Sequence, residues 1–222
     1  PNSVRTIGTS AFINCSKLER QTGMENFDTS NCTTMENMLR HIKLNKIGQD
    51  NSCDLNISKW DTKKVVNMRQ MFRNNQATYI DISNFLTPVC VCFTTMFADC
   101  SNLVTLNIEN IDMSLCEGTS SSNPQSNASD IIQRCTNLTN LTFCKNLGKG
   151  YISNLSLYQA SINLSQSSLL THDSIMSVIN NVETSITLVN IYLGSINYFK
   201  ITDEERSIAT AKNWRVTAES RN

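Results

Sequence analysis

The 222-residue sequence carries 19 Lys and Arg residues against 19 Asp and Glu residues, so no net charge attracts nucleic acid or an anionic membrane. No window approaches the roughly 20 consecutive apolar residues of a membrane span, and no charged segment followed by an apolar one opens the chain as a secretion signal. This composition argues against nucleic-acid binding and against a membrane span in this segment. The chain starts at Pro1 without an initiator Met, and we expect an internal or processed start.

The N-terminal residues contain the end of a pattern that recurs later in the chain. Phe12 and Cys15 have the same spacing as Phe97 and Cys100. We therefore expect residues 1–11 to lie in the second half of a repeat, which would continue towards the N-terminus.

The segment 24–39 matches the segment 57–72 at an offset of 33 residues. The match places Met24 on Ile57, Phe27 on Trp60, Asp28 on Asp61, Cys32 on Val65, Met35 on Met68, Met38 on Met71 and Leu39 on Phe72. The extra length lies between Arg40 and Cys53, a polar stretch that we expect to be a loop.

The clearest repeat runs from Leu55 to Phe97, where two copies align at a constant offset of 25 residues. The aligned pairs are Leu55 with Ile80, Ile57 with Ile82, Trp60 with Phe85, Val65 with Cys90, Met68 with Phe93, Met71 with Met96 and Phe72 with Phe97. A fixed period of this size is typical of a solenoid, in which each repeat buries its apolar face against a neighbouring repeat.

The pattern continues after the central copies. Residues 100–112 carry it on, and residues 135–143 repeat its first part at an offset of 35. The surplus between Cys116 and Ile131 is rich in Ser and Asn, and we predict a low-complexity surface loop there.

Each repeat has two halves with different periods. The first half alternates with the strand period of two, as at Leu55 and Ile57, and Asp61 at its end can accept backbone N–H bonds that start the next turn. The second half has helical spacing, as at Met68 and Met71. We predict an α/β fold: a right-handed solenoid of about five turns, with a parallel sheet on one face and short helical arcs on the other.

A known repeat has this pattern. The run Leu55-x-Ile57-Ser-Lys-Trp60-Asp61-Thr62, followed by Val65-x-Asn67-Met68-x-x-Met71-Phe72 and by Cys100-Ser-Asn-Leu103, resembles the BspA-type leucine-rich repeat. The resemblance covers about residues 11–147 and departs at Leu86, where Asp is usual, and at the two insertions. It implies a leucine-rich-repeat solenoid that serves as an adhesin or an exposed interaction module of a gut-type bacterium.

The repeat fades after residue 147, so we predict a solenoid over residues 1–147 and, over 148–222, last strands and an α/β capping unit. The unit should cover the open end of the sheet. Its predicted elements are one or two strands over 151–164, a helix from Ile175 to Val182 with Thr171 or Asp173 as N-cap, a strand over 186–193, a helix from Thr202 to Ala211 with a Thr202 and Glu205 capping box, a left-handed Asn213, and a strand over 214–216. This part resembles the unit that follows such repeats in gut bacterial and gut phage proteins.

The nine Cys residues cannot all pair within the chain. Cys32 and Cys90 share a repeat position with Val65, which is typical of a small buried hydrophobic residue, so we expect reduced cysteines in the core. Those two would lie two rungs apart, about 10 Å, beyond the reach of a disulfide. Cys100 and Cys135 fall on adjacent rungs, so the spacing does not exclude a disulfide between them.

Few residues suggest chemistry. His172 beside Asp173 has no nucleophile or further metal ligand at a suitable spacing, so we expect a capping or surface role. Cys90 and Cys92 bring only two thiols together, too few for zinc. The methionines recur at one place per turn and indicate a core ladder rather than a soft-metal stripe. We therefore predict no enzymatic activity, no cofactor and no metal.

Polar residues between the core positions of each strand should point outward and stack into a polar ribbon on the sheet face. Its members are Asn56, Ser58, Asp81, Ser83, Asn107 and Glu109, with Glu25 and Thr142 in the flanking turns. Solenoids bind partners through such surfaces, although ordinary solvated strand residues would look the same. The predicted ribbon lacks aromatic and Arg anchors, so binding there would be weak, carbohydrate-like or multivalent.

Two functional hypotheses follow. The first is a non-enzymatic recognition or adhesion module, on a bacterial surface or secreted, that binds a protein or glycan through the sheet face. The second is a structural or receptor-binding part of a gut phage virion, docked to neighbouring subunits. A lipobox or sorting signal elsewhere in the protein would favour the first, and tail-forming or trimerising sequence upstream would favour the second.

Overall fold

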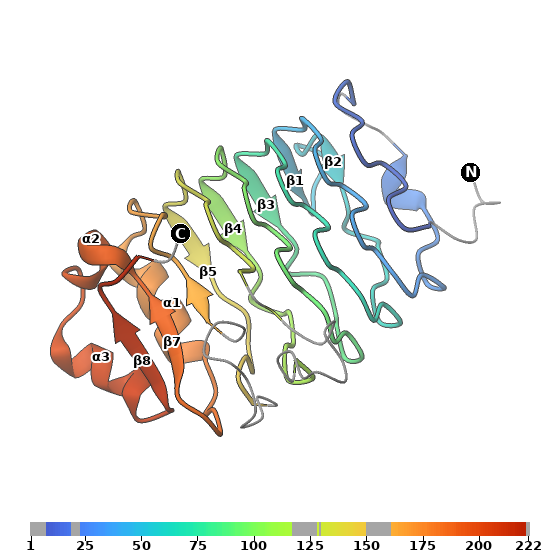
Figure 1. Ribbon diagram of the computed structural model, residues 1–222. Coiled ribbons are helices and arrows are strands. Elements are labelled where there is room, and N and C mark those ends of the chain that lie inside the picture. The colour runs from blue at the N-terminus through green and yellow to red at the C-terminus, as the bar shows by residue number, and fades with distance from the viewer. Residues whose placement is uncertain (1–7, 19–22, 117–127, 129, 150–160, 221–222) are drawn as a thin grey trace.

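The computed structural model describes residues 8–18, 23–116, 128, 130–149 and 161–220. Coils of chain lie side by side along the molecule, and the α-helices gather at its C-terminal end (Figure 1). In chain order the elements are the 3-10 helix η1 (Met24–Asn26), β1 (Lys46–Gly48), β2 (Leu55–Asn56), β3 (Tyr79–Asp81), β4 (Thr105–Asn107), β5 (Asn140–Thr142), β6 (Ile162–Asn163), α1 (His172–Asn181), β7 (Val189–Tyr192), α2 (Gly194–Tyr198), α3 (Asp203–Thr210) and β8 (Trp214–Thr217).

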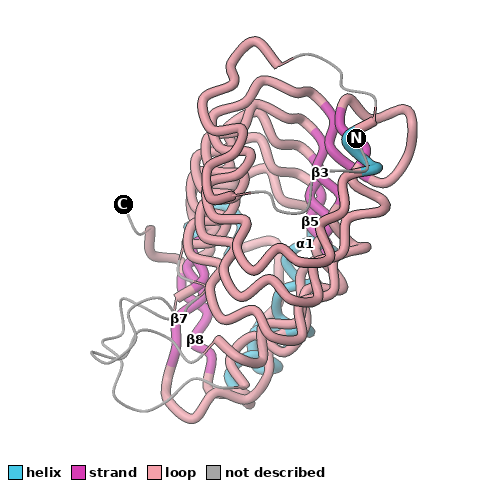
Figure 2. Tube along the Cα trace, turned by 90° about the vertical axis from the view of Figure 1, so that its right-hand side faces the viewer, coloured by secondary structure: helices cyan, strands magenta, loops and turns pink. Residues whose placement is uncertain are grey.

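The fold is mixed α/β with two parallel sheets. The first sheet has five strands in the order β2-β1-β3-β4-β5, and the second has three in the order β6-β7-β8. Every strand pair is parallel. The two sheets lie on opposite sides of the molecule, with β3 and β5 on one side and β7 and β8 on the other (Figure 2).

The core is one continuous cluster of buried side chains that runs from Met24 to Trp214. In β3, β4 and β5, the middle residue is buried in this core, while the residue on either side of it stays at least partly exposed. The repeated methionines are buried as well, and they are Met35, Met38, Met68, Met71 and Met96. Phe72 and Phe97 stack at 5.3 Å between ring centroids, so aromatic residues of successive coils also contact each other.

The predicted helical arcs are wrong. Among the described residues up to 147, the only helix is η1, and the arcs opposite the sheet are hydrogen-bonded turns. Each arc holds two residues with positive φ, four positions apart, which no α-helix accommodates. These pairs are Ser10 with Asn14, Asn37 with His41, Gln70 with Asn74, Thr95 with Asp99, and Asp130 with Arg134.

Hydrogen bonds between coils explain this geometry. The backbone N–H groups of Asn37 and Leu39 donate to carbonyls of the next coil, at Arg69 and Met71, instead of to their own chain. The residues between them turn inward, and Met38 donates to the carbonyl three positions earlier. Alternate N–H groups thus join neighbouring coils, and the three-to-four apolar spacing that suggested a helix arises from tight turns.

The polar stretch that we expected to be a loop contains strand β1. Ile47 pairs with Ile80 on one side and with Leu55 on the other, so β1 lies between β2 and β3. Leu55 and Ile80 are both buried strand residues, as the alignment predicts, but β1 separates the two copies at the sheet. The copies are in contact elsewhere on the coil, where the side-chain amide of Asn84 donates to the carbonyl of Ile57.

The predicted capping unit protects the edge of the first sheet. Helix α1 lies against β5, and the hydroxyls of Ser174 and Ser177 accept from the backbone N–H groups of Leu141 and Phe143, at 2.8 and 2.7 Å. A free sheet edge would leave these donors open to another strand. The N-cap of α1 is Thr171, whose hydroxyl accepts from the N–H of Ser174.

The remaining C-terminal elements follow the prediction in most places. Helix α3 begins with the predicted capping box of Thr202 and Glu205, Asn213 is left-handed, and β7 and β8 occupy the predicted strand segments. Helix α2 was not predicted. Residues 151–160 of the expected last strands and most of the expected surface loop lie outside the described residues.

Candidate functional site

Three of the predicted ribbon residues form an aligned row on the first sheet. Asp81, Asn107 and Thr142 are paired in register across β3, β4 and β5. A second row, on the other side of the buried central residues, was not predicted, and it consists of Lys46, Tyr79, Thr105 and Asn140. The register of parallel strands therefore brings side chains from four coils onto one face.

Three ribbon side chains also stabilise their own turns. The side-chain oxygens of Asn56, Asp81 and Asn107 accept from the backbone N–H two residues later, at 2.9, 2.9 and 3.2 Å. The N–H donors belong to the predicted ribbon residues Ser58, Ser83 and Glu109. Asx turns of this kind are common where a strand ends, so these oxygens have a structural role before any partner binds.

The ribbon is most elaborate around Asp81. The side-chain amide of Gln49 donates to Oδ1 of Asp81 at 3.0 Å and to Oγ of Ser83 at 2.5 Å. The hydroxyl of Tyr79 donates to Oδ2 of Asp81 at 3.2 Å. Burial and the neighbouring Asp81 carboxylate raise the pKa of Tyr79, so the phenol stays protonated. Tyr79 and Gln49 were not predicted from the sequence, although Tyr79 supplies the aromatic group that the predicted ribbon lacked.

Gly48 makes room for this cluster. A Cβ at this position would lie 2.9 Å from Sγ of Cys53 and 3.2 Å from Cε1 of Tyr79. The Tyr79 ring therefore packs over bare backbone. The glycine in the polar stretch 40–53 was the signal that another group approaches closely there.

Glu25 and Asn56 lie apart from the aligned row, and Ser58, Ser83 and Glu109 follow the strands instead of pairing within them. Glu25 belongs to η1, where its carboxylate accepts from the backbone N–H of Gly23 and from the amide of Asn26. Asn56 pairs with Gly48, so strand β1 separates it from Asp81. The ribbon is thus centred on β1, β3 and β4 rather than continuous from Glu25 to Thr142.

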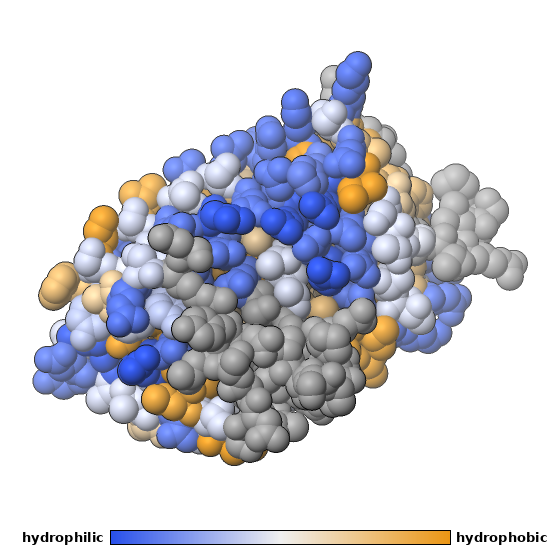
Figure 3. Space-filling model, in the orientation of Figure 1, coloured by the Kyte–Doolittle hydropathy of each residue, from blue (hydrophilic) through white to orange (hydrophobic). Residues whose placement is uncertain are grey.

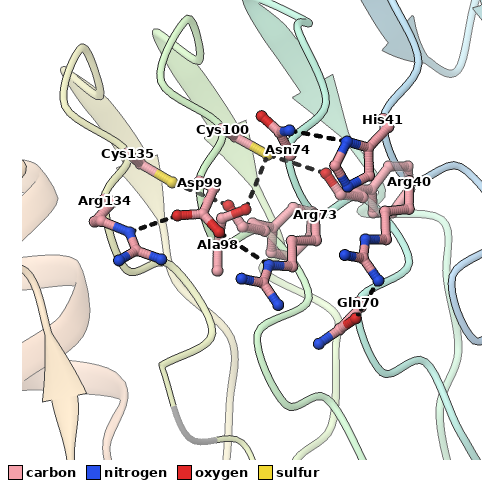
Figure 4. A network of polar contacts seen from close by, with 12 residues as sticks. Arg40, His41, Gln70, Arg73, Asn74, Ala98, Asp99, Cys100, Arg134 and Cys135 are labelled. Carbon is pink, nitrogen blue, oxygen red and sulfur yellow. Dashed lines mark hydrogen bonds and ion pairs between the residues drawn. The ribbon is translucent and has the colours of Figure 1, made fainter. Parts of the chain in front are cut away.

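A network of charged residues follows the arcs. Hydrophilic residues gather over the coils on the face that Figure 3 shows, and Figure 4 labels the side chains of the network. Asp99 accepts from Nε of Arg73 at 2.9 Å and from Nε of Arg134 at 2.5 Å. Burial alone would raise the pKa of Asp99, but the two arginines outweigh it and lower the pKa.

The same network extends towards the N-terminal coils. Arg40 donates to Oε1 of Gln70 at 2.9 Å, and Nδ1 of His41 lies 2.9 Å from Nδ2 of Asn74. Burial, followed by the charges of Arg40 and Arg73, lowers the pKa of His41 and favours its neutral form. His41, Asn74, Asp99 and Arg134 are the second left-handed residues of four successive arcs, which places their side chains in one row.

The family comparison matches residues 6–137 to the model of a family described as a Mycoplasma protein of unknown function, DUF285. The chain belongs to this family. No curated protein and no solved structure matches the chain. The DUF285 segment contains β1 to β4, every predicted ribbon residue except Thr142, and the network from Arg40 to Arg134. Both candidate surfaces are therefore features of the DUF285 part, and β5 and the second sheet lie beyond it.

His172 lies outside the DUF285 match and joins two helices. Its Nε2 lies 2.8 Å from Oε1 of Glu205 on α3, and its Nδ1 lies 3.3 Å from Oδ1 of Asp173. Hydrogen bonds to Asp173 and Glu205 raise the pKa of His172. The position agrees with the predicted surface role at the start of α1.

The cysteines are free thiols. Eight are buried and Cys15 is half-buried, so the pair Cys100 and Cys135 forms no disulfide. Their thiols donate to the carbonyls of Phe72 and Phe97 on the preceding coils, at 3.1 and 3.2 Å. Among the described residues, no group of three His, Cys, Asp or Glu could hold a metal ion, and no helix is long and apolar enough to cross a membrane.

Proposed function

We propose that this chain is a recognition module without catalytic activity, displayed on a bacterial surface or secreted, that binds a glycan or protein through the first sheet. In this proposal the stacked coils are a right-handed leucine-rich-repeat solenoid of the BspA type. The sequence resemblance and the parallel five-stranded sheet support it. The family description itself assigns no function.

One observation carries the proposal: the Tyr79, Asp81 and Gln49 cluster in the middle of the aligned polar rows. An aromatic ring beside fixed carboxylate and amide groups is a typical arrangement for contacts with a sugar or with the rim of a protein partner. Because Gln49, Tyr79 and Asp81 hold one another, the surface is preorganised, which lowers the entropy lost on binding.

The rows also explain why many weak contacts would suffice. Asn107 and Thr142 continue the row from Asp81 at the strand spacing of about 4.8 Å, so an elongated partner can contact several coils at once. Multivalent binding of this kind raises avidity without a deep pocket.

The test is binding of the labelled chain to an array of glycans and extracellular matrix proteins. Tyr79→Ala and Asp81→Asn should each weaken binding about tenfold, the effect of losing one central contact. Asp81→Asn keeps a side-chain oxygen for the turn at Ser83, removes the charge and replaces Oδ2, which accepts from Tyr79, with an NH2 group. Lys64→Ala, an exposed substitution outside the ribbon, is the control and should bind as the wild type does. Ribbon variants that bind as well as the wild type would exclude the sheet face.

The alternative hypothesis, a virion component, stays a prediction. It would use the same face or the capping unit to contact neighbouring subunits, and the location of the native protein decides between the two.

A further inference from the structure

A pocket of about 560 Å³ opens where the last coils meet the loop after β6. Its size falls within the roughly 300–1,000 Å³ of small-molecule sites. The coils contribute Asp99, Ser101, Arg134 and Thr136, and the loop contributes Gln166 and Ser168. None of these residues belongs to the ribbon on the first sheet, so this pocket is independent of the proposed recognition surface.

The positive charges around the pocket outnumber the negative ones, with Arg73, Arg134 and Lys200 against Asp99 and Asp130, whose charge also acts on Arg134. Arg134 and Arg73 both contact Asp99, which neutralises one of the two. Lys200 approaches from the capping unit, with its ammonium group 2.8 Å from the carbonyl of Ser168. The ammonium also donates to the carbonyl of Leu170 and to Oδ1 of Asn197, so its three protons are engaged and it contributes charge rather than a contact. The surroundings therefore favour an anion.

Arg134 offers a specific contact for that anion. Its Nε donates to Asp99, which fixes the guanidinium plane, while its two Nη groups donate to no other described residue. Figure 4 shows the guanidinium held on the Asp99 side through Nε, with both Nη groups directed away from that contact. A planar carboxylate can accept two parallel hydrogen bonds from such an edge.

The rest of the lining is suited to hydroxyl groups. Gln166 lines the pocket, and its Oε1 is a buried acceptor that has no hydrogen-bond partner among the described residues. Ser101, Thr136 and Ser168 add small polar side chains. The lining residues include no aromatic side chain on which a nucleobase could stack. We propose that the pocket binds a carboxylated sugar unit, with the carboxylate on Arg134 and ring hydroxyls on Gln166 and the surrounding hydroxyl groups.

The experiment is an NMR titration of the full chain with glucuronate, glucose and acetate at neutral pH. Glucuronate should bind at least about tenfold more tightly than either other probe, because glucose lacks the charge and acetate lacks the hydroxyls. The shifted amide signals should belong to residues 99–101, 134–136 and 166–168. Failure to saturate with glucuronate, equal binding of glucose or acetate, or shifts confined to other regions would overturn the proposal.

Two variants test the pocket by different means. Arg134→Gln removes the charged edge and should weaken glucuronate binding about ten- to a hundredfold, the effect of losing a charge-assisted pair. Ser101→Tyr keeps every charge and fills the space, and it should block binding even if Arg134→Gln fails to fold. Arg69→Gln is the matched control, because Arg69 is an exposed arginine that pairs with Glu36 outside the pocket. Pocket variants that bind like Arg69→Gln would contradict the assignment.

Discussion

Buried threonines join neighbouring coils at the turn after the first sheet. The hydroxyl of Thr62 donates to the carbonyl of Leu86 at 2.8 Å and accepts from the N–H of the same residue at 3.0 Å. Thr29 and Thr87 make the same pair of bonds to Asp61 and Asp112. Each hydroxyl thus satisfies both the backbone N–H and the carbonyl of one residue of the next coil, and the contact fixes the register between coils.

Replacement of Thr62 by Val should test this contact. Valine has nearly the same shape but leaves the N–H and the carbonyl of Leu86 unpaired, so we expect a loss of about 1–3 kcal/mol in the free energy of unfolding. Urea denaturation measures the change. Thr33→Val, at an exposed position of the neighbouring coil, should stay within about 0.5 kcal/mol of the wild type. Equal stability of the two variants would mean that the Thr62 contact contributes nothing.

The buried thiols predict how stability depends on pH. Burial raises the pKa of Cys90 and of Cys100 from 9.0 to about 12. Because the folded state holds these protons more tightly than the unfolded state, the stabilisation is complete below pH 9 and is lost as the pH rises towards 12. The free energy of unfolding should therefore fall across this range.

Cys90→Ala distinguishes the thiols from other groups that titrate at high pH. It should be less stable than the wild type at pH 8, because it leaves a small cavity, and its stability should decline less steeply between pH 9 and 12. A decline as steep as that of the wild type would exclude Cys90 as a contributor.

At the scale of elements, the arcs are the part in which neighbouring coils depend on each other most. Met71 is fully buried between coils. Met71→Asp would bury an unpaired charge at a cost of several kcal/mol, comparable with the whole stability of about 5–15 kcal/mol of a typical domain. We expect loss of the cooperative thermal transition, followed by circular dichroism. Val66→Asp, at a position 43% exposed on the same coil, should still melt cooperatively. An unchanged melt of Met71→Asp would contradict the assigned packing.

Repeated apolar spacing predicted the buried positions well, because Met38, Met71 and Met96 must enter the core whichever backbone carries them. It did not predict the backbone of the arcs. Three-to-four spacing is shared by helices and by tight turns. Several of the left-handed residues are Asn or Asp, which favour a positive φ, but others, such as Gln70 and Thr95, show no such preference. The role of Asp61 at a turn was easier to predict, because its carboxylate accepts from the N–H of Lys63 as expected, although strand β2 already ends at Asn56.

Strand β1 was missed for a different reason. Only Ile47 of its three residues carries a large apolar side chain, and the alternation at Leu55 and Ile57 was the stronger signal. Another sequence signal would have revealed β1, namely an apolar residue three positions before the central strand residue. Leu44 precedes Ile47 in this way, as Leu103 precedes Leu106. The proposed binding surface was predicted only in part for the same reason. Asp81 lies on a strand that the sequence predicted, whereas Gln49 follows β1, which was not predicted.

The molecule as a whole has one core, so we expect it to unfold as one unit. Trp60 donates its indole N–H to the carbonyl of Met24 near the N-terminal coils, and Trp214 donates to the carbonyl of Glu183 in the capping unit. Trp60→Phe and Trp214→Phe each leave a single tryptophan, because the chain has two. Within each variant, tryptophan fluorescence and circular dichroism should give the same urea midpoint. Different midpoints from the two methods would show that the coils and the capping unit unfold separately.

Surface display is the central claim at this scale, and it connects the polar rows of the first sheet to an external partner. The most direct measurement treats intact cells from the native source with a protease and then detects this chain, with a cytosolic protein as control. Our account predicts that the chain is degraded while the cytosolic protein survives, and that the chain sediments with cell envelopes. Protection of the chain until the cells are lysed, or its co-purification with phage particles at a fixed stoichiometry, would contradict a role as a surface recognition module.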